Sequence, residues 1–347
     1  MGARAAAGTS PTSFAWLAIL VALLAPACTP STIEEAERKG DAAWLDQNGT
    51  PDAVAALGRL ADTNPKALAA LEARSTFDLR AFRAAWDAVV RGAPWGGTML
   101  RGGLTDPKRA DLAASAVNRH DARLVPFIGD LEQALVRLSA TLQNFNVASA
   151  LASVGKPAHE AIVRRLGDAS TRGAMCRGIA SKDADADARK ALMDVPESGR
   201  DSPSCVDAVV SLASEDDVAL GWMAEKGEPG LLGAAGKEER LPCARLHVAW
   251  TKALTTRPVE VYSALTVPLG YAVKRCTPEM DGVLADAVVH LPATHALLVQ
   301  AIDPFTGYGS ALRATCAALP MIAGGRDGAV VRERANDVLN HACKAPG

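Results

Sequence analysis

The chain has 347 residues, of which 49% are hydrophobic, only 4% are aromatic, and 69, about a fifth, are Ala. Ala has the highest helix propensity, whereas β-sandwiches and barrels need β-branched and aromatic residues to cover their sheets. The composition therefore favours an all-α fold. The formal net charge of −2, from 37 basic and 39 acidic residues, argues against a nucleic-acid-binding protein, and the high apolar content argues against intrinsic disorder.

The N-terminal segment has the composition of an export signal. Residues 14–25 (FAWLAILVALLA) are apolar throughout, Arg4 is the one charge ahead of them, and small residues follow at 25–27. A helix of this length reaches about 18 Å, short of the roughly 30 Å hydrocarbon core of a membrane. We therefore expect residues 1–27 to be a secretory signal peptide and residues 28–34 to be a polar tether.

The segment LLAPAC, which ends at Cys28, resembles a bacterial lipobox. In a lipobox the Cys is acylated and becomes the mature N-terminus, so the resemblance implies an exported lipoprotein, anchored to a cell-envelope membrane on the periplasmic face or in the outer membrane. Ordinary cleavage after Ala27 would instead give a secreted form that begins at the same Cys, and an uncleaved anchor helix is a third reading. If Cys28 carries lipid, six of the seven Cys remain, the number that three disulfides require in an oxidising compartment.

These six Cys recur at a regular interval. Cys176, Cys243 and Cys316 follow one another at similar intervals, and the interleaved set of Cys205, Cys276 and Cys343 keeps nearly the same spacing. The intervals indicate a period of about 70 residues, or two helical hairpins of about 35 residues each. Because each period holds one early and one late Cys, the spacing predicts the pairs Cys176–Cys205, Cys243–Cys276 and Cys316–Cys343. The alternative is that these Cys are free thiols buried as small hydrophobic residues.

Residues 150–168 (ALASVGKPAHEAIVRRLGD) contain a short apolar segment, a Gly-x-Pro turn and a second, amphipathic helix. This pattern resembles the HEAT repeat of the bacterial phycobilisome-lyase type, in which an Asp-containing turn leads to a helix with an Arg in its first turn, as Asp168 and Arg172 do here. The resemblance implies a right-handed α-solenoid of antiparallel helical hairpins. We expect N-terminal hairpins over 35–110, one HEAT-like sub-array over 111–200, and a second, with the disulfides, over 201–347.

Capping residues define the expected N-terminal helices. Thr50 and Asn64 each precede a Pro, which predicts helices over 51–62 and 65–74, and a third is expected over 77–90. Residues 92–107 and 303–309 are rich in Gly and Pro and are expected to be loops. They carry Trp95, Phe305 and Tyr308, which we single out as possible partner contacts; the alternative for each ring is an anchor folded onto its own core.

The sequence points to binding more than to catalysis. No HExxH or paired CxxC pattern occurs, so we expect no metal and no cofactor. The leading hypothesis is a non-enzymatic, lipid-anchored scaffold that binds a protein or peptide partner, and no nucleic acid. One alternative is an enzyme with its active site in the two loops, using Asp303, Tyr308 and His295, and another is a purely structural envelope spacer.

Overall fold

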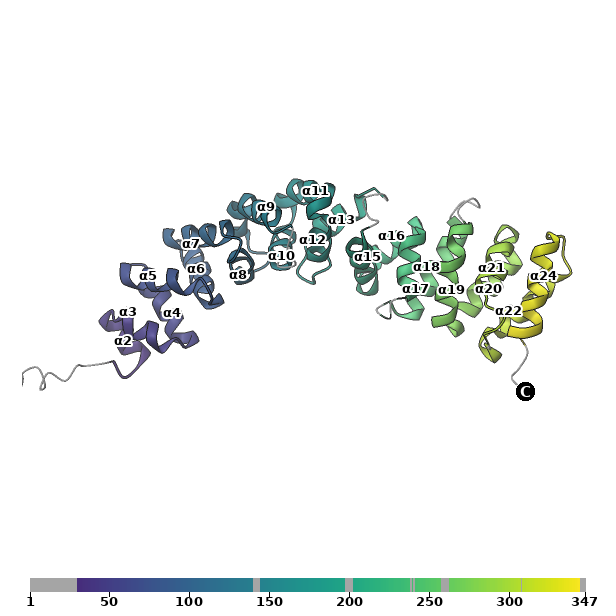
Figure 1. Cartoon of the computed structure of the whole chain (residues 1–347), viewed down its shortest axis with the longest axis horizontal. Coiled ribbons are helices and arrows are strands. Elements are labelled where there is room, and N and C mark those ends of the chain that lie inside the picture. Colours follow the sequence, from purple (N-terminus) through teal and green to yellow (C-terminus); the bar gives the residue numbers. More distant parts are fainter. Residues whose placement is uncertain are drawn as a thin grey trace, which may run out of the picture. The chain divides into compact units, whose positions relative to one another are not determined.

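The computed structural model describes residues 30–139, 144–196, 202–237, 239, 241–256, 262–306 and 308–343. Throughout these ranges the chain is helical with short connections and contains no strand (Figure 1). The predicted all-α class is therefore confirmed. The signal peptide expected at residues 1–27 and the lipid site expected at Cys28 lie outside the described residues.

The chain forms two compact units, Met1–Gly103 and Leu104–Gly347. In the first unit, helices α2 to α6 each pack against an adjacent helix or the next but one. Its helices are α2 Ile33–Lys39, α3 Ala42–Asn48, α4 Pro51–Leu60, α5 Pro65–Arg74, α6 Leu79–Arg91 and α7 Pro94–Thr105, the last of which crosses the boundary between the units.

Helix starts in the first unit follow the capping signals. Thr50 accepts a hydrogen bond from the backbone N–H of Ala53, and Asn64 accepts one from the N–H of Lys66, as predicted from the Pro that follows each cap. The third predicted helix begins at Leu79, later than expected, because Asp78 accepts from the N–H of Arg80 and is itself the N-cap.

The expected loop at residues 92–107 is wrong, because most of it is helix α7. The glycines that suggested a loop allow close packing instead. A Cβ atom built on Gly96 would lie 2.4 Å from the carbonyl oxygen of Ala85 in α6, closer than any side chain tolerates. Gly92 alone has the left-handed backbone expected of a turn, with φ of 81°, and it ends α6.

The second unit consists of consecutive α-helices with a few short 3₁₀ turns between them. The first half contains α8 Ala110–Ala116, η1 Ala122–Phe127, α9 Ile128–Arg137, α10 Phe145–Ala152, η2 Lys156–Ala158, α11 His159–Gly167, α12 Ala169–Ile179, α13 Ala186–Asp194 and α15 Pro203–Glu215. The second half contains α16 Asp217–Lys226, α17 Pro229–Lys237, α18 Cys243–Thr256, α19 Tyr262–Arg275, α20 Thr277–His290, η4 Pro292–Thr294, α21 His295–Ala301, η5 Gly309–Leu312, α22 Arg313–Ala318, α23 Pro320–Ala323, α24 Ala329–Asp337 and the π-helical turn η6 Val338–Ala342.

Helices of this unit pack against the next helix but one, which sorts most of them into two sets. One set runs through α8, α10, α12, α15, α17, α19, α21 and α24, each in contact with the next. Helices α9, α11 and α13 contact one another in the same way, as do α16, α18, α20 and α22. Successive helices such as α11 and α12, or α15 and α16, join the two sets. The buried residues between the sets are mainly Ala, Leu and Val.

Long-range side-chain bonds repeat at nearly constant sequence separation. Arg164 binds Glu132 across 32 residues, Arg245 binds Asp217 across 28, and Arg275 donates to the carbonyl of Leu241 across 34. In the first unit Arg91 donates to the carbonyl of Gly58 across 33 residues. A recurrent separation of about 30 residues is the spacing expected when equivalent helices of successive hairpins lie side by side.

The three predicted disulfides are present: Cys176–Cys205, Cys243–Cys276 and Cys316–Cys343, with Cα atoms 4.9, 5.4 and 5.7 Å apart. The first joins neighbouring helices α12 and α15 of one set. The second joins the start of α18 to the residue before α20, and the third joins α22 to the end of η6. The alternative of free buried thiols is thereby set aside.

None of the described helices is, by itself, long and apolar enough to cross a membrane. The helices Thr277–His290 and Pro292–Ala301, which meet at a bend of 116°, reach that length and apolar composition only when they are taken together.

Candidate binding groove

A groove of about 400 Å³ lies on the α10–α12–α15 face of the second unit. Helix α12 and the turn after it contribute Arg177, Ala180 and Ser181, helix α15 contributes Ser204, Asp207, Ala208 and Ser211, and α10 contributes Phe145. We call this set the α12–α15 groove. It combines one cation, one anion, three hydroxyls and an aromatic ring, and such a mixture of apolar and orienting polar groups is typical of ligand sites.

Arg177 is the central polar residue of the groove. Its Nη1 donates to the hydroxyl of Ser204 at 3.1 Å, and its Nη2 donates to Oδ1 of Asn144 at 3.0 Å. Asn144 directly precedes α10, so the half-buried guanidinium bridges three neighbouring helices. Both acceptors are neutral, and among the described residues no carboxylate lies within ion-pair distance of Arg177.

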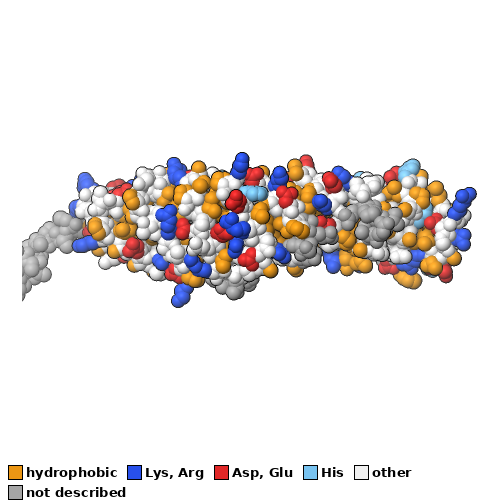
Figure 2. Space-filling view, turned by 90° about the horizontal axis from the view of Figure 1, so that it is seen from above, with side chains coloured by type: hydrophobic (Ala, Val, Ile, Leu, Met, Phe, Trp, Pro, Cys, Tyr) orange, Lys and Arg blue, Asp and Glu red, His pale blue; other side chains and the backbone are white. Residues whose placement is uncertain are grey.

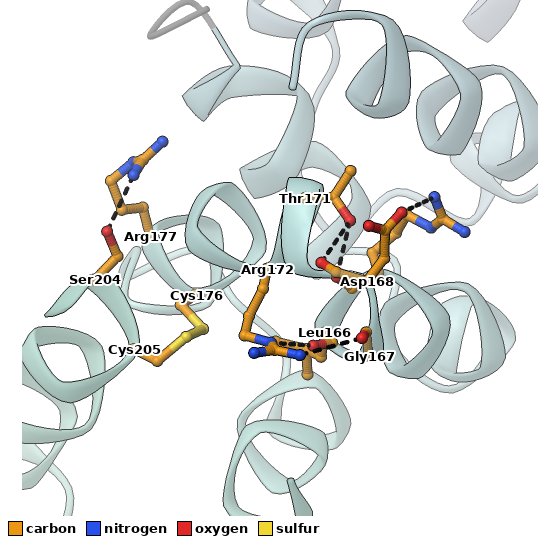
Figure 3. Close-up of a disulfide and its surroundings, with 10 residues drawn as sticks. Leu166, Gly167, Asp168, Thr171, Arg172, Cys176, Arg177, Ser204 and Cys205 are labelled. Carbon is orange, nitrogen blue, oxygen red and sulfur yellow. Dashed lines mark hydrogen bonds and ion pairs between the residues drawn. A yellow bond between two sulfur atoms is a disulfide. The ribbon is translucent and has the colours of Figure 1, made fainter. Parts of the chain in front are cut away.

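The floor of the groove is held rigidly. Cys176 and Cys205, which precede Arg177 and follow Ser204 in sequence, form a buried disulfide directly beneath this pair (Figure 3). On the other side, Gly178 lies so close to Ala148 of α10 that a built Cβ atom would come within 2.5 Å of the Ala148 carbonyl carbon. A covalent link on one side and a backbone contact on the other fix α12 between its neighbours. Sites on rigid helices are positioned more precisely than sites on loops.

Arg172, on the same helix, has a different role. Its Nε donates to the carbonyl of Leu166 at 2.8 Å and its Nη2 to that of Gly167 at 3.1 Å, so it closes the C-terminus of α11 (Figure 3). Asp168 caps α12 by accepting from the hydroxyl and the backbone N–H of Ser170, and these bonds lower the pKa of the Asp168 carboxyl. The Asp and Arg of the HEAT-like turn thus serve the local helix junction.

Trp95 is anchored within the first unit. It lies in the first turn of α7, is half-buried, and donates from Nε1 to Oδ1 of Asp62 at 2.8 Å. Arg91 donates to the same oxygen at 3.2 Å. Burial raises the pKa of the Asp62 carboxyl, but the bonds from Trp95 and Arg91 outweigh it and the net shift is downward. The indole is therefore bonded at a helix junction and keeps part of its surface exposed, and its role as a partner contact stays a prediction.

The other predicted contact residues lie in a real loop. Residues 303–306 and 308 are non-helical; Phe305 is 84% exposed, with its ring 5.9 Å from that of His341, whereas Tyr308 is only 9% exposed. Burial raises the pKa of the Tyr308 hydroxyl. Phe305 is thus available at the surface, and Tyr308 is largely a core residue.

The acid–base residues of the enzymatic alternative are engaged in local bonds. Asp303 accepts from the N–H of Phe305 at 3.0 Å and from the Thr306 hydroxyl at 2.8 Å, which shapes its own turn. The ring of His295 is held between the Asp327 carboxylate, at 3.0 Å, and the carbonyl of Val288, at 2.9 Å.

A metal site and a second pocket are the remaining candidates for a functional site. Among the described residues, no group of three or more His, Cys, Asp or Glu side chains is arranged to hold a metal ion. Cys243, which stands four residues before His247, is bonded to Cys276. A second pocket, of about 350 Å³, lies between α11 and α13 and is lined mostly by apolar residues such as Val163, Leu166 and Val195.

Sequence reasoning did not single out the residues of the α12–α15 groove. One signal was available: Arg177 follows Cys176, and Ser204 precedes Cys205, so the predicted disulfide already brings these two polar residues together. Phe145 and Asp207 carried no comparable signal, because their proximity depends on how α10 and α15 flank α12.

Comparisons with known proteins give no relative for this chain: no family model matches it, and neither a curated protein nor a solved structure is significantly similar to it.

Proposed function

We propose that this chain is an exported, lipid-anchored helical-repeat scaffold that binds a protein partner in the cell envelope. The observation that carries the proposal is the α12–α15 groove, which is lined by an exposed aromatic ring, several hydroxyls and Arg177, an Arg that pairs with no carboxylate among the described residues. Its residues come from three helices that a disulfide and a close Gly–Ala contact hold in place. Interfaces commonly use Arg and aromatic residues as anchors.

The repeat architecture rests on two observations. Helices pack on the next but one along most of the second unit, and side-chain bonds recur at a nearly constant sequence separation in both units. Both are expected of stacked antiparallel hairpins, and the proposal of a right-handed α-solenoid of HEAT type adds to them the sequence resemblance at residues 150–168. Arrays of this kind present extended surfaces on which protein partners bind.

Location in the envelope is supported by the disulfides. Three disulfides favour an oxidising compartment, because cytosolic thiols are kept reduced. The apolar segment at residues 14–25 and the lipobox-like sequence ending at Cys28 add an export signal and an attachment point. One acyl chain alone binds a membrane reversibly, so a lipoprotein anchor with several chains would retain the scaffold at the surface.

The experiment that tests this function is affinity capture from solubilised envelope membranes, with the full-length protein as bait. A variant with the groove altered at two positions, Phe145→Ser and Asp207→Lys, serves as the matched control. The expected result is one reproducible protein that the wild type retains and the control loses. If wild type and control retain the same background proteins, the scaffold proposal fails and a structural spacer is the better description.

A further inference from the structure

We propose that the α12–α15 groove recognises an extended segment of a protein partner that carries both charges, with a carboxylate side chain bound at Arg177 and a basic side chain bound at Asp207. This inference rests on the proposed scaffold function and specifies the chemistry of its ligand.

Arg177 differs from most bonded Arg residues of its unit in the nature of its acceptors; Arg137 is the nearest parallel, with one bond to the Gln133 side chain and one to a backbone carbonyl. Arg164 and Arg245 are paired with carboxylates. Arg172, Arg275 and Arg334 donate to backbone carbonyls, which have fixed positions in the fold. Arg177 instead donates to two neutral side-chain oxygens, and these two bonds use two of the five N–H donors of a guanidinium.

A carboxylate is the acceptor that fits this arrangement best. Charge-assisted hydrogen bonds between a guanidinium and a carboxylate are about twice as strong as bonds to neutral oxygens, and they are often bidentate. The hydroxyls of Ser181 and Ser211, which also line the groove, can donate to a bound carboxylate or to a peptide carbonyl. The apolar surface of Phe145, 44% exposed, accommodates a neighbouring apolar side chain.

Asp207 supplies the second charge. It is exposed on α15, and among the described residues no cation lies within ion-pair distance of it. Asp207 lies three positions after Ser204 on α15, so the two residues are separated by a rise of about 4.5 Å along the helix. Ser204 is the residue to which Arg177 donates. Side chains on one face of an extended peptide are about 7 Å apart. Because Arg177 and Asp207 line the same groove, a bound segment that places an acidic side chain at Arg177 brings a nearby residue of that segment to Asp207, where a Lys or Arg is complementary.

The same charge pattern disfavours a phosphate group or an anionic lipid surface. Asp207 would repel a multiply charged phosphate bound at Arg177, and the described residues of the groove lining include no second cation. The described lining of the groove therefore sets one cation beside one anion, and a single carboxylate is the matching anion for Arg177. On the face that Figure 2 shows, acidic and basic side chains are interspersed.

The test is selection of peptides from a random display library on immobilised full-length protein with its disulfides formed. Wild type is compared with Arg177→Gln, with Asp207→Asn, and with Arg137→Gln as a matched control. Arg137 lies on α9, outside the groove, where it donates to Gln133 and to the carbonyl of Thr105. Circular dichroism and non-reducing peptide mapping verify that each variant is folded and correctly paired.

We expect wild type and the Arg137 variant to enrich peptides with an acidic residue a few positions from a Lys or Arg. Arg177→Gln should abolish the acidic preference and weaken binding of a selected synthetic peptide about tenfold or more, whereas Asp207→Asn should relax only the basic preference. Excess inorganic phosphate, or vesicles that contain phosphatidylglycerol, should not displace the peptide.

Three outcomes would overturn the inference. These are selected peptides without an acidic preference, the same preference in Arg177→Gln, and displacement of the peptide by phosphate or by the vesicles. Affinity capture separates this failure from failure of the scaffold function. One result would do so: wild type and Arg177→Gln retain the same partner, and the control with Phe145→Ser and Asp207→Lys loses it. The scaffold function would then stand, and the binding of a carboxylate at Arg177 would be refuted.

Discussion

Two glycines on helix α12 should respond in opposite ways to the same substitution. A Cβ atom on Gly178 would lie 2.5 Å from the carbonyl carbon of Ala148 and 2.8 Å from its oxygen, both backbone atoms that cannot rotate away. A Cβ atom on Gly173 would have its nearest neighbour, the Ser204 hydroxyl oxygen, at 3.6 Å, which is an ordinary contact. Only the first substitution forces α10 and α12 apart, by about 1 Å.

The magnitudes follow from two opposing effects. Ala is favoured over Gly in a helix by up to about 1 kcal/mol, and overpacking a close contact costs about 1–3 kcal/mol. Gly178→Ala should therefore lower the free energy of unfolding by about 1–2 kcal/mol, and Gly173→Ala should raise it by about 0.5–1 kcal/mol. The gap between the two variants is about 2 kcal/mol, or about 4–8 °C in Tm for a unit of this size.

Urea unfolding of the oxidised protein, followed by circular dichroism, measures both changes, and the unfolding slope shows whether the transition remains comparable between variants. The two variants share one helix and one type of substitution, so helix propensity is matched between them. Equal stabilisation by both Ala residues would refute the close approach of α10 and α12 and, with it, the rigid floor of the groove.

The remaining predictions concern the anchor, a disulfide and an ion pair. Mass spectrometry of the mature N-terminal peptide should find Cys28 acylated, and Cys28→Ser should move the protein from the membrane to the soluble fraction; an unmodified Cys28 would contradict the anchor. Replacing Cys176 and Cys205 together by Ser should lower the free energy of unfolding by about 3 kcal/mol, because the closed loop of 29 residues no longer restricts the unfolded chain. An unchanged denaturation midpoint would contradict this prediction. Arg59 donates two hydrogen bonds to Glu37 and thereby lowers the pKa of that carboxyl from its ordinary value of 4.5, so this stabilisation is present above pH 4.5 and is lost as the pH falls through the lowered value. Because both side chains are partly exposed, the contribution should stay below about 1 kcal/mol, and Glu37→Gln should remove it from the pH profile of unfolding; an unchanged profile would count against the pair.

The fold class and the disulfide pairing could be predicted because they depend on repeated, local features. Ala-rich composition favours helices wherever they pack, and the Thr50 and Asn64 caps act on backbone N–H groups two or three residues away. The spacing of the Cys residues reported the hairpin period directly, so Cys176 and Cys205 could be paired before any contact was known.

Helix α7 shows where such reasoning fails. Its sequence contains Gly96 and three further glycines, which locally favour a turn. The helix forms because Gly96 lets α7 approach α6 closely, a contact between two helices that residue-by-residue propensity does not register.

Predicting the residues of the α12–α15 groove would have required knowledge of the tertiary structure even more than predicting helix α7. Phe145, Arg177 and Asp207 come from three different helices that are well separated in the sequence, and none belongs to a recognisable motif. What makes Arg177 a candidate binding residue is the absence of a carboxylate beside it among the described residues, and that depends on which side chains the neighbouring helices present.

Site-specific photo-crosslinking in living cells tests partner binding at the groove most directly. A photoreactive amino acid is placed at Ser211, which lines the groove, and in a separate variant at Val330 on α24, which is 74% exposed and lies outside it. A partner-binding groove predicts one discrete, light-dependent adduct at Ser211 that is absent at Val330. Equal labelling of many proteins from both positions, or no adduct at Ser211 in cells whose envelope contains the folded protein, would contradict it.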